Sequence, residues 1–119
     1  MHNFKNLTVW QKSIDLTTQI YSITKGFPSD EKYGLTSQIR RAAVSLPSNI
    51  AEGAGRKSAK EFKHFLSIST GSIFELETQI IVAHRLDLID ELIMNEISLK
   101  ISEIQKMLYG LEKSINSTN

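Results

Sequence analysis

Glu61 and His64 form the first pair of residues whose types and spacing could do chemistry. Di-iron helix bundles use this Glu-x-x-His spacing twice, together with further inward carboxylates, to hold their metals. The chain has a single copy, and Phe62 and Phe65 mark the buried side of the same stretch. His64 is therefore expected to face solvent, and the sequence predicts no metal site and no cofactor.

Other arrangements typical of catalysis are also missing. Glu75 and Glu77 are two residues apart, so they face different sides of a helix and make a poor acid–base pair. His84 is expected at the surface or at an interface, and His2 lies at a terminus expected to fray. The chain has no cysteine, which excludes thiol catalysis and disulfides. The sequence predicts no catalytic residues, no small-molecule substrate and no enzymatic activity.

Positive charge is concentrated after the glycines of Gly53-Ala54-Gly55-Arg56-Lys57-Ser58. This stretch is not a nucleotide-binding P-loop, because Arg56 interrupts the glycine-lysine-serine adjacency and a helix is expected before it instead of a strand. It leads into a helix N-terminus, where free amides and the helix dipole attract anions. The residues predicted to contact RNA or DNA phosphates, without sequence specificity, are Arg56, Lys57, Lys60 and Lys63.

Pro47 interrupts a helical pattern at a cost of roughly 3 kcal/mol. One interpretation is a kink, with Ser48 and Asn49 helping to satisfy the carbonyls that the proline frees. The alternative is that the kink exposes backbone groups to a ligand. Asn49 is close to the apolar stripe of its helix, so it fits a buried, hydrogen-bonded residue better than a ligand contact.

The spacing of apolar residues at threes and fours predicts the elements that would position these groups. Four helices are expected, at about residues 8–25, 31–53, 58–86 and 90–116, with no strand. Thr8 with Gln11, and Ser58 with Glu61, match the capping-box pattern at helix starts. The economical packing is an all-α, antiparallel up-and-down four-helix bundle in one domain, residues 1–119, with the second helix kinked at Pro47.

Composition is that of an ordinary globular protein, with 40% apolar and 23% charged residues among 119. The longest apolar run, residues 80–83, is far shorter than the ~20 residues that span a membrane. The first ten residues lack the apolar core of a signal peptide. We therefore expect a soluble cytoplasmic protein that contacts no membrane, with a fraying polar tail at residues 116–119.

Charge divides along the chain although the net charge is only +1. Residues 40–64 have six Lys or Arg against two Asp or Glu, and residues 65–119 have four against eight. In an antiparallel bundle this predicts a basic end, consisting of Lys5, Lys12, Arg56, Lys57, Lys60, Lys63 and Lys113. It also predicts an acidic end of Asp30, Glu31, Asp87, Asp90, Glu91 and Glu96, diluted by Lys25, Lys32 and Arg85. An ordinary solvated surface with scattered charge is the alternative.

Apolar residues outside the core stripes favour self-association. Contiguous patches of them would mark a subunit interface, whereas scattered ones would be ordinary surface. These flanking residues are Trp10, Ile14, Tyr21, Ile68, Phe74, Ile81 and Met94. Small residues in the third helix, including Ser69, Gly71 and Ser72, are expected to allow close helix packing within or between subunits, and Gly110 to do the same in the fourth.

A longer string identifies a family resemblance. It consists of Tyr33-Gly34-Leu35, residues 38–53 with Ser45-Leu46-Pro47-Ser48-Asn49-Ile50-Ala51-Glu52-Gly53, and then Gly55-Arg56, Glu61-Phe62, Gly71-Ser72 and residues 75–77. Together these stretches closely resemble the four-helix-bundle proteins first noticed as reading frames within 23S rRNA intervening sequences. The residues that carry the family pattern, with structural roles, are Arg40, Arg41, Ser45, Pro47, Asn49, Glu52, Gly53 and Glu75. One departure is Asp87, where such proteins usually have glycine between the third and fourth helices.

The resemblance implies an all-helical bundle that is often a homo-oligomer, commonly a homopentamer, with no established enzymatic activity. A more distant relative, an accessory protein of diversity-generating retroelements, binds nucleic acid and a reverse transcriptase. The leading hypothesis is thus a non-enzymatic oligomeric bundle that contacts nucleic acid through its basic end. The alternative is a structural or protein-interaction module that binds no nucleic acid, in which the two ends contact each other or a partner protein.

Overall fold

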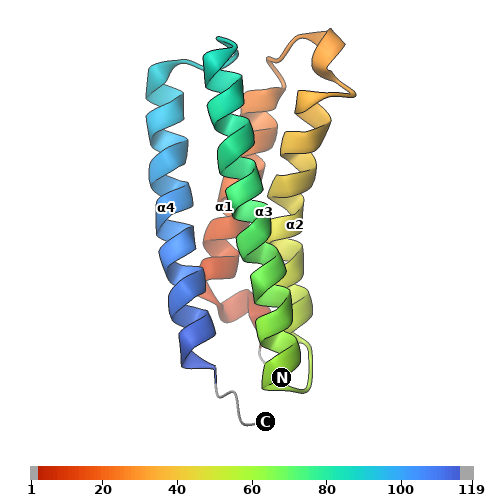
Figure 1. The fold of residues 1–119 in the computed structure, drawn as a ribbon, viewed down its shortest axis with the longest axis vertical. Coiled ribbons are helices and arrows are strands. Elements are labelled where there is room, and N and C mark those ends of the chain that lie inside the picture. The colour runs from red at the N-terminus through yellow and green to blue at the C-terminus, as the bar shows by residue number, and fades with distance from the viewer. Residues whose placement is uncertain (1–2, 116–119) are drawn as a thin grey trace.

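Four long helices make up most of the computed structural model, which describes residues 3–115. They are α1 (Thr8–Thr24), α2 (Leu35–Ala54), α3 (Ala59–Arg85) and α4 (Glu91–Ser114), and two short 3-10 helices, η1 (Phe4–Asn6) and η2 (Ser29–Glu31), precede α1 and α2. The α2–α3 connection lies at the same end as the start of α1 and the end of α4, and the other two connections lie opposite (Figure 1). Residues 3–115 contain no strand, so the predicted all-α, up-and-down four-helix bundle is confirmed.

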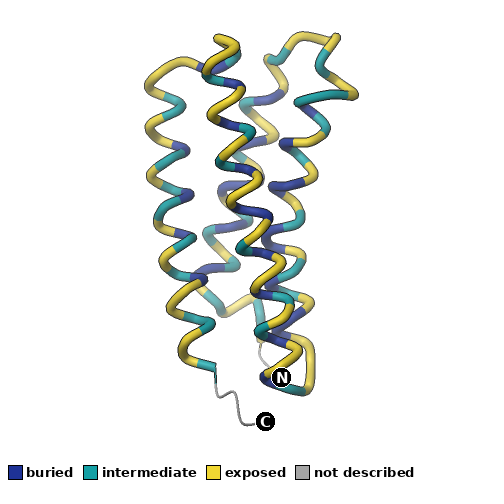
Figure 2. The backbone as a smooth tube through the Cα atoms, viewed as in Figure 1, coloured by how far each residue is buried: buried dark blue, intermediate teal, exposed yellow. Residues whose placement is uncertain are grey.

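The core consists of the apolar stripes that the spacing predicts. Buried residues follow one another along the inner side of every helix, while the outer sides are exposed (Figure 2). The large side chains that are fully buried are Leu16, Ile20, Ile39, Leu46, Ile50, Leu66, Ile73, Leu76, Ile80, Ile97, Ile101 and Ile104. Burying each of them stabilises the bundle by about 1.5–3 kcal/mol, before the entropy cost of ordering the chain.

The start of α2 and the cap of α1 differ from the prediction. Residues 31–34 are not part of α2, because η2 and a turn occupy this stretch and the Glu31 carboxylate accepts a hydrogen bond from the Leu35 amide, at 3.3 Å. Thr8 is the first residue of α1 and not its cap, since the N-cap residue is Leu7, without a side-chain cap. The Gln11 side chain instead donates to the Lys5 carbonyl, at 2.8 Å.

The other helix ends have recognisable caps. Ser58 Oγ accepts a hydrogen bond from the Glu61 amide at 3.1 Å, which confirms Ser58 as the cap of α3. Asp90 caps α4 in the same way, since its Oδ1 accepts from the Ile93 amide at 2.8 Å. The predicted end of the last helix and the predicted fraying tail, residues 116–119, lie outside the described residues, as does His2.

Asp87 gives the turn after α3 the geometry that a glycine would give. Its φ is 61°, and it is the one residue other than glycine with a positive φ among residues 3–115. The Leu88 amide donates to the Ala83 carbonyl at 2.9 Å, and the Asp87 amide donates to the His84 carbonyl at 3.0 Å. These bonds form a Schellman motif, which normally has glycine at the left-handed position. The departure from the family pattern therefore leaves the turn intact.

Candidate nucleic-acid interface

Pro47 packs inside the bundle and exposes no backbone group to a ligand. It is buried, and the carbonyl that it leaves without a helical donor, that of Ala43, accepts a hydrogen bond from Thr17 Oγ1 in α1 at 2.9 Å. The idea that the proline opens a ligand site is therefore wrong. The partner is also not Ser48 or Asn49, because it comes from a neighbouring helix, which sequence spacing cannot identify.

Hydrogen bonds between helices surround the proline. Ser45 Oγ lies 2.8 Å from Ser72 Oγ, and Ser69 Oγ donates to the Leu46 carbonyl at 2.9 Å, so both bonds join α2 to α3. Asn49 Nδ2 donates to the Ser45 carbonyl at 2.9 Å and lies 3.0 Å from Ser45 Oγ. Ser45 thus joins α2 to α3, and Asn49 bonds to Ser45 within α2, while the roles predicted for the family-pattern residues stay predictions.

Arg40, Glu52 and Gly53 also have structural contacts. Arg40 Nε donates to Thr24 Oγ1 at 2.8 Å, which ties α2 to the end of α1. Glu52 forms an ion pair with Arg56 at 2.9 Å. Gly53 is buried where α2 and α3 meet, and a Cβ there would lie 2.8 Å from the Phe65 Cβ. Arg41 and Glu75, the other two residues of the family pattern, are exposed.

The predicted phosphate contacts gather around the start of α3. Lys57 and Lys60 are exposed there, beside the Ser58 cap, and Lys63 is half-buried one turn further along. A shallow depression of about 390 Å³ opens at this point, lined by Gly55, Arg56, Lys57, Ser58 and Glu61. The structure therefore brings the loop and the helix N-terminus together as the sequence predicts.

Arg56 is less available than its neighbours. Its Nη2 pairs with the Glu52 carboxylate at 2.9 Å, and its guanidinium carbon lies 4.8 Å from the centre of the Phe65 ring. The Glu61 carboxylate in the depression also repels an anion. The side chains best placed to reach a phosphate are therefore Lys57 and Lys60.

The rest of the basic end is partly paired. Lys12 forms an ion pair with Glu103 of α4 at 3.1 Å. Lys113 lies above the Tyr109 ring, 5.3 Å from its centre, and lines a second depression with Lys63, Tyr109 and Glu112. Lys5 is exposed beside η1. The basic end is thus a patch of exposed lysines around the α2–α3 connection, and Lys12 contributes little to its charge.

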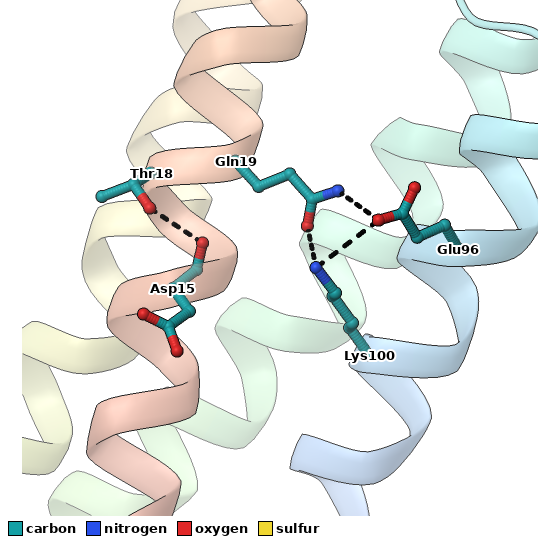
Figure 3. A network of polar contacts seen from close by, with 5 residues as sticks. All are labelled: Asp15, Thr18, Gln19, Glu96 and Lys100. Carbon is teal, nitrogen blue, oxygen red and sulfur yellow. Dashed lines mark hydrogen bonds and ion pairs between the residues drawn. The ribbon is translucent and has the colours of Figure 1, made fainter.

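More residues of the predicted acidic end than of the basic end form contacts within the chain. Glu31 and Asp90 cap α2 and α4, and Glu91 pairs with His84 at 3.1 Å. Between α1 and α4, Glu96 accepts a hydrogen bond from Gln19 at 3.0 Å and lies 3.7 Å from Lys100 Nζ, which also donates to Gln19 (Figure 3). Several of these carboxylates therefore hold helices in place instead of presenting charge to a partner.

The histidines show no arrangement suited to chemistry. His64 is exposed, as expected, and its ring stacks edge-on against Phe65 with the centres 5.3 Å apart. His84 is half-buried in the contact with Glu91 described above. Within residues 3–115, no three His, Asp or Glu side chains are grouped so that they could hold a metal ion.

The predicted interface residues separate into two groups. Tyr21, Ile68, Phe74 and Ile81 are exposed, whereas Trp10 and Met94 pack partly against the core and Ile14 is half-buried. Sequence reasoning missed the most exposed leucines, Leu92 and Leu99 of α4, which are 79% and 74% exposed. They lie one heptad apart, and the signal that could have found them is this spacing on the side opposite the core stripe.

Small residues do not all serve helix packing. Ser69 and Ser72 are buried and hydrogen-bonded, as close packing requires. A Cβ at Gly71 or at Gly110 would meet no atom within 4 Å, so neither glycine is needed for contact within the chain. Neither glycine therefore serves close packing within a single copy, and packing between subunits at these two positions stays a prediction.

None of the helices in the described part of the chain is long and apolar enough to cross a membrane. A family model described as 23S rRNA-intervening sequence protein matches residues 5–110. Among solved structures, the chain is similar to a protein of unknown function from the S23 ribosomal protein family of Bacteroides thetaiotaomicron, with 25% identity and a TM-score of 0.83. That match covers 89% of this chain and 96% of the other. No curated protein matches the chain.

Proposed function

The chain belongs to the 23S rRNA-intervening sequence protein family, and from this premise we propose that it is a non-enzymatic bundle whose basic end binds the phosphate backbone of RNA or DNA. The observation that carries the proposal is the position of Lys57 and Lys60, both exposed at the capped start of α3. The amides of the first helical turn add partial positive charge at the same place. Phosphates would thus meet mobile ammonium groups and fixed dipoles together.

The expected contact is electrostatic and independent of sequence. Lysine ammonium groups hold phosphates as point charges, and they do not read base edges. The aromatic residues nearest the site, Phe62 and Phe65, pack at or near the core, so they offer no stacking platform for bases. Single-stranded and double-stranded nucleic acid of any sequence should therefore bind with similar dependence on salt.

The test is the affinity of a labelled single-stranded RNA for the K57Q/K60Q variant, measured by fluorescence anisotropy at low salt. Binding should weaken about three- to tenfold, because two phosphate contacts are lost. The control K25Q/R85Q removes the same charge from exposed residues at the opposite end of the bundle and should bind like the unmodified protein. Equal loss in both variants would contradict a site at the start of α3, and no binding by the unmodified protein would favour the structural or protein-interaction module.

We also propose that copies of the chain self-associate, as a ring of five, through the apolar residues exposed on α3 and α4. Phe74, Leu92 and Leu99 are all more than half exposed in a single copy, and covering such apolar area is favourable. Light scattering after size exclusion should give a mass about five times that of the 13.4 kDa chain. The variant L92Q/L99Q should shift the mass toward the monomer with little loss of helicity. A monomer at micromolar concentration of the unmodified protein would contradict the proposal.

A further inference from the structure

A groove of about 410 Å³ lies between the end of α1 and the start of α2, at the opposite end of the bundle from the α2–α3 connection. Three cationic side chains, two tyrosines and two hydroxyl-bearing residues line it, and none of the lining residues is a carboxylate. Lys32, Arg40 and Arg41 supply the charge. The function proposed above uses none of these groups.

Arg40 lines this groove and is held by contacts with α1. Its Nε donates to Thr24 Oγ1 at 2.8 Å, its Nη2 donates to the Tyr21 carbonyl at 3.4 Å, and its guanidinium carbon lies 4.6 Å from the centre of the Tyr21 ring. A guanidinium has further N–H donors beyond these two. An anion would therefore meet a donor whose position is already fixed, which lowers the entropy cost of binding.

Thr36 supplies a second, independent indication of a ligand. The residue lines the groove, is only 8% exposed, and its Oγ1 is buried without a hydrogen-bond partner among the described residues. A buried hydroxyl in a folded protein normally has a partner.

Thr36 and Ser37 also belong to the first turn of α2, whose amides have no acceptor within the helix. The Glu31 carboxylate takes the Leu35 amide, so the amides of Thr36 and Ser37 are the ones left to face an anion. Arg41 is exposed at the same site.

Tyr33 is the most exposed large hydrophobic residue in the described part of the molecule, at 90%. Lys32 Nζ lies 5.5 Å from the centre of its ring, so one face of the ring already contacts a cation. An aromatic face beside several cations is the arrangement that stacks a flat ring while its phosphate is neutralised.

We propose that this groove binds a mononucleotide. The phosphates lie against Arg41, Lys32, the remaining Arg40 donors and the first turn of α2, and the base stacks on Tyr33. The site is separate from the lysines at the start of α3, so it does not depend on the proposed binding of nucleic acid there.

The experiment titrates the full chain with magnesium-free ATP, inorganic pyrophosphate and adenosine, by isothermal titration calorimetry. ATP should bind most tightly, because it alone uses both the cations and Tyr33. The variant K32Q/R41Q should weaken both ATP and pyrophosphate at least tenfold, which corresponds to about 1.4 kcal/mol. Y33A should weaken ATP and leave pyrophosphate unchanged. These three side chains are exposed, so the variants should keep the melting temperature of the unmodified protein, and Arg40 is left in place because it ties α1 to α2.

The control is K57Q/K60Q, which should bind ATP as the unmodified protein does. Equal loss of ATP binding in the control and in K32Q/R41Q would show general attraction of anions and overturn the proposal. No saturable ATP binding up to about 1 mM would overturn it as well. Binding of single-stranded RNA that K32Q/R41Q weakens, without binding of ATP, would assign the groove to a polynucleotide and reject a mononucleotide site.

Discussion

Gly53 shows, at the scale of one residue, why this fold needs a glycine near the end of α2. Its Cα lies so close to α3 that an added Cβ would be 2.8 Å from the Phe65 Cβ and 3.2 Å from the Phe62 carbonyl oxygen. Both neighbours belong to α3 at or near the backbone, so neither can move away cheaply. A glycine is needed here for close approach of two helices, and not for a special φ.

Gly53→Ala should therefore lower the free energy of unfolding by about 1–3 kcal/mol, although alanine favours a helix by roughly 1 kcal/mol over glycine. Urea denaturation followed by circular dichroism measures the change. Gly71→Ala is the matched control, because a Cβ at that exposed position in α3 meets nothing within 4 Å. It should raise stability by about 0.4–1 kcal/mol. Equal effects of the two substitutions would contradict the close packing at Gly53.

Thr17 donates the hydrogen bond that replaces the helical bond lost at Pro47. Thr17→Val should cost about 1–3 kcal/mol, because it leaves the buried Ala43 carbonyl without a donor. In the Pro47→Ala background an amide hydrogen returns to position 47 and can bond this carbonyl, so the same substitution should cost less. A double-mutant cycle by urea denaturation should give a coupling of about 1 kcal/mol. Additive effects would show that Thr17 does not replace the missing helical bond.

At the scale of the element, the spacing of apolar residues predicts where the helices lie better than it predicts where each helix begins. The stripe through Ile97, Ile101, Ile104 and Leu108 places α4 because burial follows the helical period. The start of α2 is different. The prediction places residues 31–34 in the helix, but the Glu31 carboxylate accepts a hydrogen bond from the Leu35 amide and the helix begins at Leu35. A side-chain oxygen here takes an amide that a backbone carbonyl would otherwise accept, and the spacing of apolar residues cannot predict this.

The turn after α3 carries a prediction of its own. Asp87 adopts a φ of 61°, a conformation that costs a residue with a Cβ about 1–2 kcal/mol and costs glycine little. Asp87→Gly should raise the free energy of unfolding by about 0.5–1 kcal/mol, after the greater freedom of the unfolded chain is subtracted. Asp87→Val should lower it, since branching at Cβ makes this φ less favourable. Thermal melting of both variants checks the order, and a Val variant as stable as the Gly variant would contradict the assignment of strain to this turn.

At the scale of the whole molecule, the order and direction of the helices decide which charged residues lie at the same end of the bundle. Alternating helix directions bring the α2–α3 connection to the end where α1 begins and α4 ends, so Lys57, Lys60 and Lys63 share that end with Lys5 and Lys113. This grouping follows from the sequence once four helices are recognised. Which charges remain available does not follow, because the pairing of Arg56 with Glu52 and of Lys12 with Glu103 depends on rotamers and on contacts between helices.

The groove at the start of α2 was not predicted from the sequence, because it too depends on contacts between helices. Lys32, Tyr33, Arg40 and Arg41 lie in a stretch interpreted as helix and family pattern, and Tyr21 comes from another helix. Only the short turn before α2 brings Lys32 and Tyr33 beside Arg40 and Arg41. An end of the molecule that the sequence marks as acidic thus contains a cationic groove.

The measurement that tests the central claim most directly is the salt dependence of binding to single-stranded RNA. For the unmodified protein, the logarithm of the association constant should fall linearly with the logarithm of salt concentration. For K57Q/K60Q the slope should be smaller by roughly 1.4, about 0.7 for each lost phosphate contact, while K25Q/R85Q keeps the original slope. A slope that is the same in all three proteins would contradict the claim that the lysines at the start of α3 hold the nucleic acid backbone.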